Sequence, residues 1–186
     1  MIAAPRAVVV GAALALAGGA AAADDERSSL DVELSARVPV AARRDLAEPG
    51  LGLSARVRVP LGPRLEATAQ LGLAGYLPRT QQLAGIEVER DLAQAPVLGG
   101  IRLGFADRDR THAFLAAEAG VVFERVRTTS AGAREVDDAL ELAAAVGAGV
   151  VGRRWSVAMG LGTTRPHDGL GASTATVTVG WNLLRR

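Results

Sequence analysis

The sequence predicts an all-β fold, an eight-stranded antiparallel up-and-down transmembrane β-barrel that follows an N-terminal signal peptide. Eight segments alternate apolar and polar residues with the period of two that is typical of strands with one apolar face. The connections between these segments are long and short in turn. No stretch after Ala23 stays apolar for the ~20 residues that a membrane-spanning helix needs. The length of 186 residues suits a single domain.

The first 23 residues have the three parts of a signal peptide. Arg6 supplies a positive charge, AVVVGAALALAGG is an apolar run of signal-peptide length, and a row of alanines precedes Asp24. The apolar run is too short to favour a membrane anchor. We therefore expect a signal peptide over residues 1–23, cleaved after Ala23, and an outer-membrane β-barrel domain over residues 24–186.

The composition excludes several classes of function. The 21 basic residues, all arginine, exceed the 20 acidic residues by one, and Arg6 leaves with the signal peptide. The mature chain is therefore neutral, and no basic patch favours nucleic-acid binding. The chain has no cysteine and two histidines, His112 and His167, which gives no basis for a disulfide, a metal site or a cofactor.

The first three expected strands separate the two kinds of residue cleanly. They cover residues 29–40, 50–60 and 64–76. In the second of them, Arg56 and Arg58 fall on the face opposite to Val57 and Val59. A helix would spread these charges around its surface, whereas a strand places them all on one side.

Five further segments complete the set. They cover residues 95–105, 112–126, 139–151, 154–162 and 173–184. The alanine-rich parts, 113–122 and 139–148, have a composition that favours helix, but Gly120, Gly147 and Gly149 favour strands. Strict alternation also places Phe114 on the polar face.

The connections predict how the strands are arranged. The long ones are 41–49, 77–94, 127–138 and 163–172, and the short ones are 61–64, 106–112 and 152–154. In an up-and-down antiparallel sheet, alternate connections lie at opposite ends. One end therefore carries tight periplasmic turns and the other carries extracellular loops, of which residues 77–94 are the chief candidate for a working surface.

The residue types indicate which face is outside. The apolar set is mostly leucine, valine and alanine, which suit lipid, whereas the polar set mixes glycine with charges of both signs, which suits a narrow lumen filled by ion pairs. Phe105, Trp155 and Trp181 fall near one rim on the apolar face, as in an aromatic girdle. The charges predicted to face the lumen are Arg37, Arg56, Arg58, Arg102, Asp31, Glu33, Glu66, Glu118, Glu124 and Glu141.

This pattern resembles the small eight-stranded outer-membrane barrels of the OmpA/OmpX type, from about residue 29 to residue 184. The last segment, TATVTVGWNLLRR, is similar to the C-terminal assembly signal of that class, but it ends in Arg185 and Arg186 instead of an aromatic residue. The resemblance implies a location in the outer membrane, contact with its lipids, and the barrel-assembly machinery as a partner during biogenesis. Our first hypothesis is a non-enzymatic role in envelope structure or in loop-mediated surface interaction, whose partner the sequence does not identify.

Two other functions remain open at this stage. A lipid-active enzyme would need Ser130, His167 and Asp168 to converge at the outer rim, although no nucleophile motif accompanies them. A soluble periplasmic barrel would bind a small apolar ligand and would turn its apolar face inward. The sequence itself indicates no catalytic, cofactor-binding or metal-binding residue.

Overall fold

The computed structural model describes residues 28–41, 47–83, 85–106, 111–165 and 172–185, and within them every regular element is a strand. Among these residues no helix is long and apolar enough to cross a membrane. The predicted signal peptide, residues 1–23, lies outside the described residues. The strands are β1 (Ser29–Ala41), β2 (Gly50–Pro60), β3 (Leu65–Tyr76), β4 (Arg79–Leu83), β5 (Ile86–Gly104), β6 (His112–Ser130), β7 (Ala133–Val151), β8 (Trp155–Arg165) and β9 (Ala172–Arg185).

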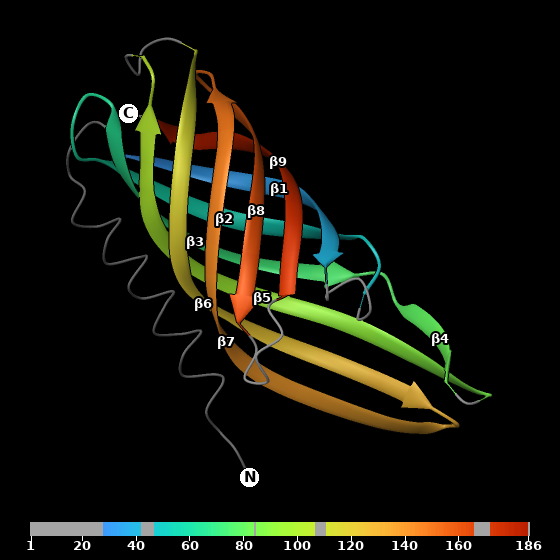
Figure 1. Cartoon of the computed structure of the whole chain (residues 1–186). Coiled ribbons are helices and arrows are strands. Elements are labelled where there is room, and N and C mark those ends of the chain that lie inside the picture. The colour runs from blue at the N-terminus through green and yellow to red at the C-terminus, as the bar shows by residue number, and fades with distance from the viewer. Residues whose placement is uncertain (1–27, 42–46, 84, 107–110, 166–171, 186) are drawn as a thin grey trace.

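Eight of the strands close into a barrel, and the short β4 extends it at one rim (Figure 1). The order is β3-β2-β1-β9-β8-β7-β6-β5-β4, and pairing of β3 with β5 completes the ring. All pairings are antiparallel, so the predicted up-and-down topology is confirmed. The two alanine-rich segments are strands, because they pair with both neighbours.

The apolar and polar residues that alternate along each strand lie on opposite sides of the barrel wall. Leu142 is 70% exposed and Leu161 is 58% exposed, whereas Asp31 and Arg102 are only 2% and 4% exposed. The apolar set therefore faces outward and the charged set faces the lumen, as predicted. A soluble barrel would place its apolar face inside, so this alternative is wrong.

The outward apolar residues form a belt with definite edges. On β6 the belt runs from Leu115 to Phe123 and ends at Arg125, which is followed on the outer face by Arg127. At the opposite end Trp155 and Trp181 are cross-strand partners, and both are about half exposed. The eight steps from Leu115 to Phe123, each of ~3.3 Å and tilted by ~40°, rise roughly 20 Å, which approaches the ~25 Å apolar band of membrane barrels.

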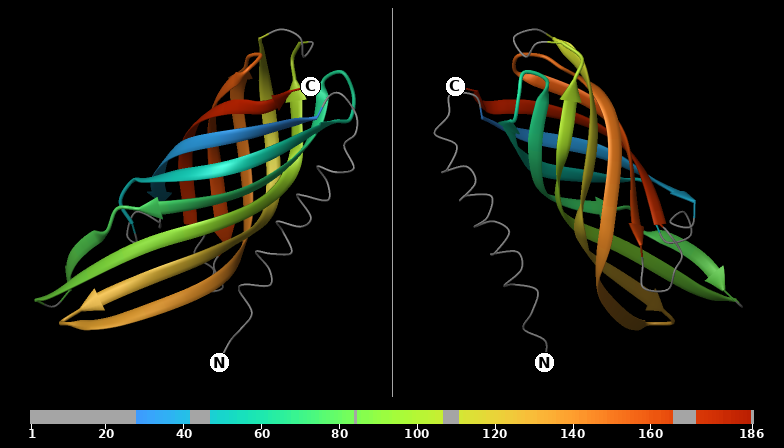
Figure 2. Two further views of the ribbon diagram at one scale, coloured as in Figure 1. Left: turned by 180° about the vertical axis from the view of Figure 1, so that it is seen from behind. Right: turned by 60° about the vertical axis from the view of Figure 1, so that its left-hand side comes forward.

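Beyond the belt, β5, β6 and β7 continue as a projecting sheet (Figure 2). Each has 19 residues, whereas β1, β2, β3, β8 and β9 have 11 to 14. The expected loops are therefore corrected: residues 77–94 contain β4 and the first half of β5, and residues 127–138 are strand except for a turn at Ala131–Gly132. Both faces of this sheet meet water, so the alternation that reveals a strand within the belt is lost.

The pairing of β3 with β5 has one interruption. It runs from Leu65 to Leu71 and resumes at Ala74, so Gly72 and Leu73 have no recorded ladder partner in β5. The register is the same on both sides of the gap, which lies opposite Ala95 and Pro96. Since β5 pairs with β6 through Pro96 without a break, the missing amide hydrogen of the proline accounts for a gap on the β3 side.

Candidate functional site

The middle of the lumen is occupied by one arginine held between two carboxylates. Arg56 Nε donates to Glu33 Oε1 at 2.9 Å, and its Nη1 forms an ion pair with Glu118. Its Nη2 donates to Gln70 Oε1, also at 2.9 Å. These side chains come from β1, β2, β3 and β6, so a single guanidinium connects four strands across the lumen.

A second ion-pair cluster lies nearer the short turns. Arg58 contacts Asp31 twice, Nη2 to Oδ1 at 2.9 Å and Nε to Oδ2 at 2.6 Å. Glu66 Oε2 lies 3.7 Å from both Arg58 and Arg102. The Arg102 guanidinium carbon lies 3.4 Å from the centre of the Phe114 ring. Phe114 is thus inside the barrel, as its parity predicts, where it covers a buried cation.

The upper lumen holds a third group, which is centred on Gln94. The hydroxyl of Tyr76 donates to Gln94 Oε1 at 2.7 Å, and the Gln94 amide nitrogen donates to Glu124. Directly above, Ala74, Tyr76 and Leu92 are buried together with Ala47. This small apolar cluster closes the charged side of the lumen toward the projecting sheet.

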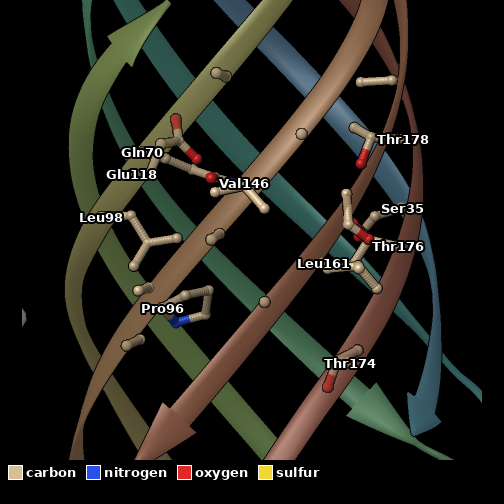
Figure 3. Close-up of a pocket in the computed structure, with 18 of the residues that line it drawn as sticks. Ser35, Gln70, Pro96, Leu98, Glu118, Val146, Leu161, Thr174, Thr176 and Thr178 are labelled. Carbon is tan, nitrogen blue, oxygen red and sulfur yellow. The ribbon is translucent and has the colours of Figure 1, made fainter.

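The lumen has two contrasting walls. The charged wall consists of the inward side chains of β1, β2, β3, β5 and β6 described above. The small wall consists of the inward residues of β7, β8 and β9 between Ala143 and Thr178, which are chiefly alanine, glycine, serine and threonine. Figure 3 shows Gln70 and Glu118 on one side and Thr174 and Thr176 on the other. A cavity of ≈150 Å³ remains between the walls.

The expected salt-bridged plug is therefore confirmed on the charged wall but does not fill the whole lumen. The cavity has room for a few water molecules, each of which takes ~30 Å³ in the liquid. The threonines and the carboxylates give such waters hydrogen-bonding partners. Within the described residues, no group of three or more metal-ligating side chains lies here or elsewhere.

The projecting sheet carries ion pairs on the outer face, just beyond the belt. Arg125 donates to both carboxylate oxygens of Asp138, at 2.7 and 2.8 Å. The next arginine on the same face, Arg127, lies 3.4 Å from Asp91 on β5. Hydrogen bonding to Arg125 lowers the pKa of the Asp138 carboxyl below its usual value. Three strands are thereby held together where no lipid supports them.

The residues of the enzymatic alternative are not brought together by the part of the chain that the structure describes. Ser130 ends β6 at the tip of the projecting sheet, opposite Val88 and Ala133. His167 and Asp168 lie outside the described residues. His112 begins β6 at the other end of the barrel, opposite Val151, so it lies far along the strand from Ser130.

Sequence reasoning missed three features that shape the site. It did not identify Gln94 and Tyr76 as lumen residues, because they lie in or beside the stretch expected to be a loop. It gave no account of Pro96, although a proline within a strand pattern indicates weakened pairing. It also could not say which strands face each other across the lumen, which determines where the cavity lies.

No protein-family model matches this chain, and no curated protein matches it, but solved structures share its fold. Ail, the attachment invasion locus protein of Yersinia pestis, aligns with a TM-score of 0.61 at 13% identity, over 84% of this chain and 97% of Ail. The N-terminal β-barrel domain of OprF from Pseudomonas aeruginosa gives 0.51 at 11% identity, over 84% and 98%. The outer-membrane enzyme PagL gives 0.50 at 13% identity, over 81% and 97%.

These likenesses concern the fold. By their descriptions Ail is an attachment invasion locus protein, the OprF structure is a β-barrel domain, and PagL is an outer-membrane enzyme. The predicted resemblance to small outer-membrane barrels is confirmed. The closed barrel and its apolar belt together are those of a protein that spans the outer membrane.

Proposed function

We propose that this protein is a non-enzymatic outer-membrane barrel that presents the sheet of β5, β6 and β7 to the cell exterior as a contact surface. The single observation that carries the proposal is the length of these strands, which continue well past the outer edge of the belt. The opposite end of the barrel has short connections, as periplasmic ends do. A non-catalytic surface role needs a rigid support and an exposed sheet, and this chain has both.

The chemistry of the projecting sheet supports a role in contact. Residues 133–140 of β7 are all exposed, and in the described part of the chain β8 pairs with β7 only from Leu142 onward. The outer edge of β7 therefore presents backbone hydrogen-bonding groups together with the side chains of Glu135 and Asp137. Ail is named as an attachment protein, which is consistent with surface contact by a barrel of this fold.

Single-cysteine labelling tests the orientation, because the chain has no cysteine of its own. Ala133→Cys lies beside the β6–β7 turn, and Arg153→Cys lies in the β7–β8 turn at the other end. A maleimide carried on a 5-kDa polymer, too large for outer-membrane pores, is added to intact cells. We expect Ala133→Cys to react at once and Arg153→Cys to react only after the outer membrane is opened.

A truncated chain tests the role of the sheet itself. Replacing residues 127–136 by a two-residue turn shortens β6 and β7 while leaving the belt intact. We expect the truncated barrel to migrate as a folded band on unheated gels. We expect cells that carry this truncated barrel to adhere less to surfaces and to other cells. Equal adherence of cells with the truncated and the full-length barrel would limit the role to envelope structure. In the labelling test, reaction of Arg153→Cys alone in intact cells would mean that the barrel has the opposite orientation in the membrane. Lipid deacylation by the purified protein that Ser130→Ala abolishes would favour the enzymatic alternative.

A further inference from the structure

An apolar furrow runs along the outer face of the barrel at the joint between β3 and β5. Its floor consists of small residues, Gly75, Ala93 and Ala95. Gly75 and Ala93 are direct cross-strand partners, and a Cβ atom on Gly75 would meet no heavy atom within 4 Å. Larger side chains of the neighbouring strands stand on either side, Leu51 on β2 and Phe123 on β6.

The furrow is a distinct site within the belt. It has a volume of ≈560 Å³, within the range of small-molecule sites, and its lining is almost wholly apolar except for Gln94 and Arg125. Leu53 and Leu73 are 57% and 69% exposed, so no part of the described chain covers it.

One end of the furrow is marked by a positive charge at the edge of the belt. Arg125 borders the furrow, and its side chain is 49% exposed. Its two hydrogen bonds to Asp138 use Nε and one terminal nitrogen, and a guanidinium has five N–H donors. The remaining donors can bind a second anion, and planar guanidinium groups are well suited to phosphate.

We propose that the furrow binds a phosphorylated glycolipid of the outer leaflet, with one acyl chain along Gly75, Ala93 and Ala95 and a phosphate at Arg125. An extended hydrocarbon chain suits an open apolar furrow that ends at the water boundary beside a cation. The assignment to the outer leaflet rests on the proposed function, which places the projecting sheet outside the cell. The binding chemistry itself depends only on the furrow and Arg125.

The probe is diphosphoryl lipid A, added to the full mature protein in detergent and followed by native mass spectrometry. Gly75→Leu fills the floor of the furrow, and we expect it to weaken lipid A binding at least tenfold. The matched control is Gly99→Leu, on the same pair of strands. An added Cβ at Gly99 has no neighbour closer than 3.7 Å, and Gly99 does not border the furrow. We expect Gly99→Leu to bind as the unmodified protein does.

A second pair of variants tests the phosphate contact. Arg125→Gln should weaken binding of diphosphoryl lipid A about tenfold and leave binding of dephosphorylated lipid A unchanged. Arg127→Gln, on the same face but away from the furrow, should change neither. Equal binding by Gly75→Leu and Gly99→Leu would overturn the acyl site, and equal binding of phosphatidylglycerol would overturn the choice of lipid.

The two proposals can fail separately. Binding in detergent does not depend on orientation in the cell, whereas the labelling of Ala133→Cys does. If lipid A binds at the furrow but Ala133→Cys is labelled only in opened cells, the surface role fails and the lipid site stands. If labelling is as expected but the Gly75→Leu and Arg125→Gln variants bind normally, the lipid site fails alone.

Discussion

The charged wall and the small wall of the lumen are built from strands of similar outer surface but opposite inner surface. Outside, both present leucine and valine to the belt. Inside, Arg56 alone connects four strands through carboxylates and an amide, whereas Thr174, Thr176 and Thr178 reach only a short way into the cavity. The contrast indicates that the ion pairs and side-chain hydrogen bonds of the interior stabilise mainly the charged wall. The small wall is stabilised mainly by backbone hydrogen bonds between its strands and by contact with lipid.

The largest expected effect comes from the centre of the charged wall. Arg56→Met removes the cation between Glu33 and Glu118 and leaves two buried carboxylates without their partner. Breaking a buried pair in this way costs about 3–5 kcal/mol. Urea unfolding in lipid vesicles measures the change, and a loss below about 1 kcal/mol would mean that the network contributes little.

The outer surfaces of the two walls should respond alike. Leu161→Arg on β8 and Val57→Arg on β2 each put a charge into the lipid-facing side of a strand, which costs about 2–4 kcal/mol near the middle of a bilayer. The same unfolding measurement compares them. If the substitution on β8 is tolerated as well as one in a turn, the lipid-facing assignment of the small wall is wrong.

Two inward glycines, one on each wall, differ in the space around them. An added Cβ on Gly100, on β5, would lie 2.7 Å from Glu118 Cα, so Gly100→Ala requires a backbone shift that costs about 1–3 kcal/mol. An added Cβ on Gly162, on β8, would have no neighbour closer than 3.8 Å. Gly162→Ala should therefore leave the free energy of unfolding within about 0.5 kcal/mol of its original value. Equal costs at the two positions would contradict this difference in space.

The smallest effect concerns the gap in the ladder, on the charged side. Pro96→Ala restores an amide hydrogen on β5 opposite Gly72, where the pairing with β3 is interrupted. We expect a gain of about 1 kcal/mol, the usual value of one added hydrogen bond. The new amide of residue 96 should exchange slowly because it donates to β3, and fast exchange at this position would show that the proline does not cause the gap.

The sequence predicts the fold where the environment imposes an alternation and fails where it does not. Leu71 and Gln70 meet lipid and lumen respectively, so their types reveal the strand, and even Phe114 could be placed inside by parity. Residues 127–138 meet water on both sides, so nothing in their order distinguishes a strand from a loop. The ion pairs could be expected as a group, but their partners depend on strand stagger, which side-chain type does not encode.

The pairing of Trp155 with Trp181 has a spectroscopic consequence. These are the only two tryptophans of the chain, and they are neighbours on the last two strands. Trp181 is also the partner of Val32 on β1, so it lies where the first and last strands of the chain pair. Intrinsic tryptophan fluorescence of the unmodified protein therefore reports on the place where the chain's two ends meet, whereas the projecting sheet has no tryptophan and does not contribute to it.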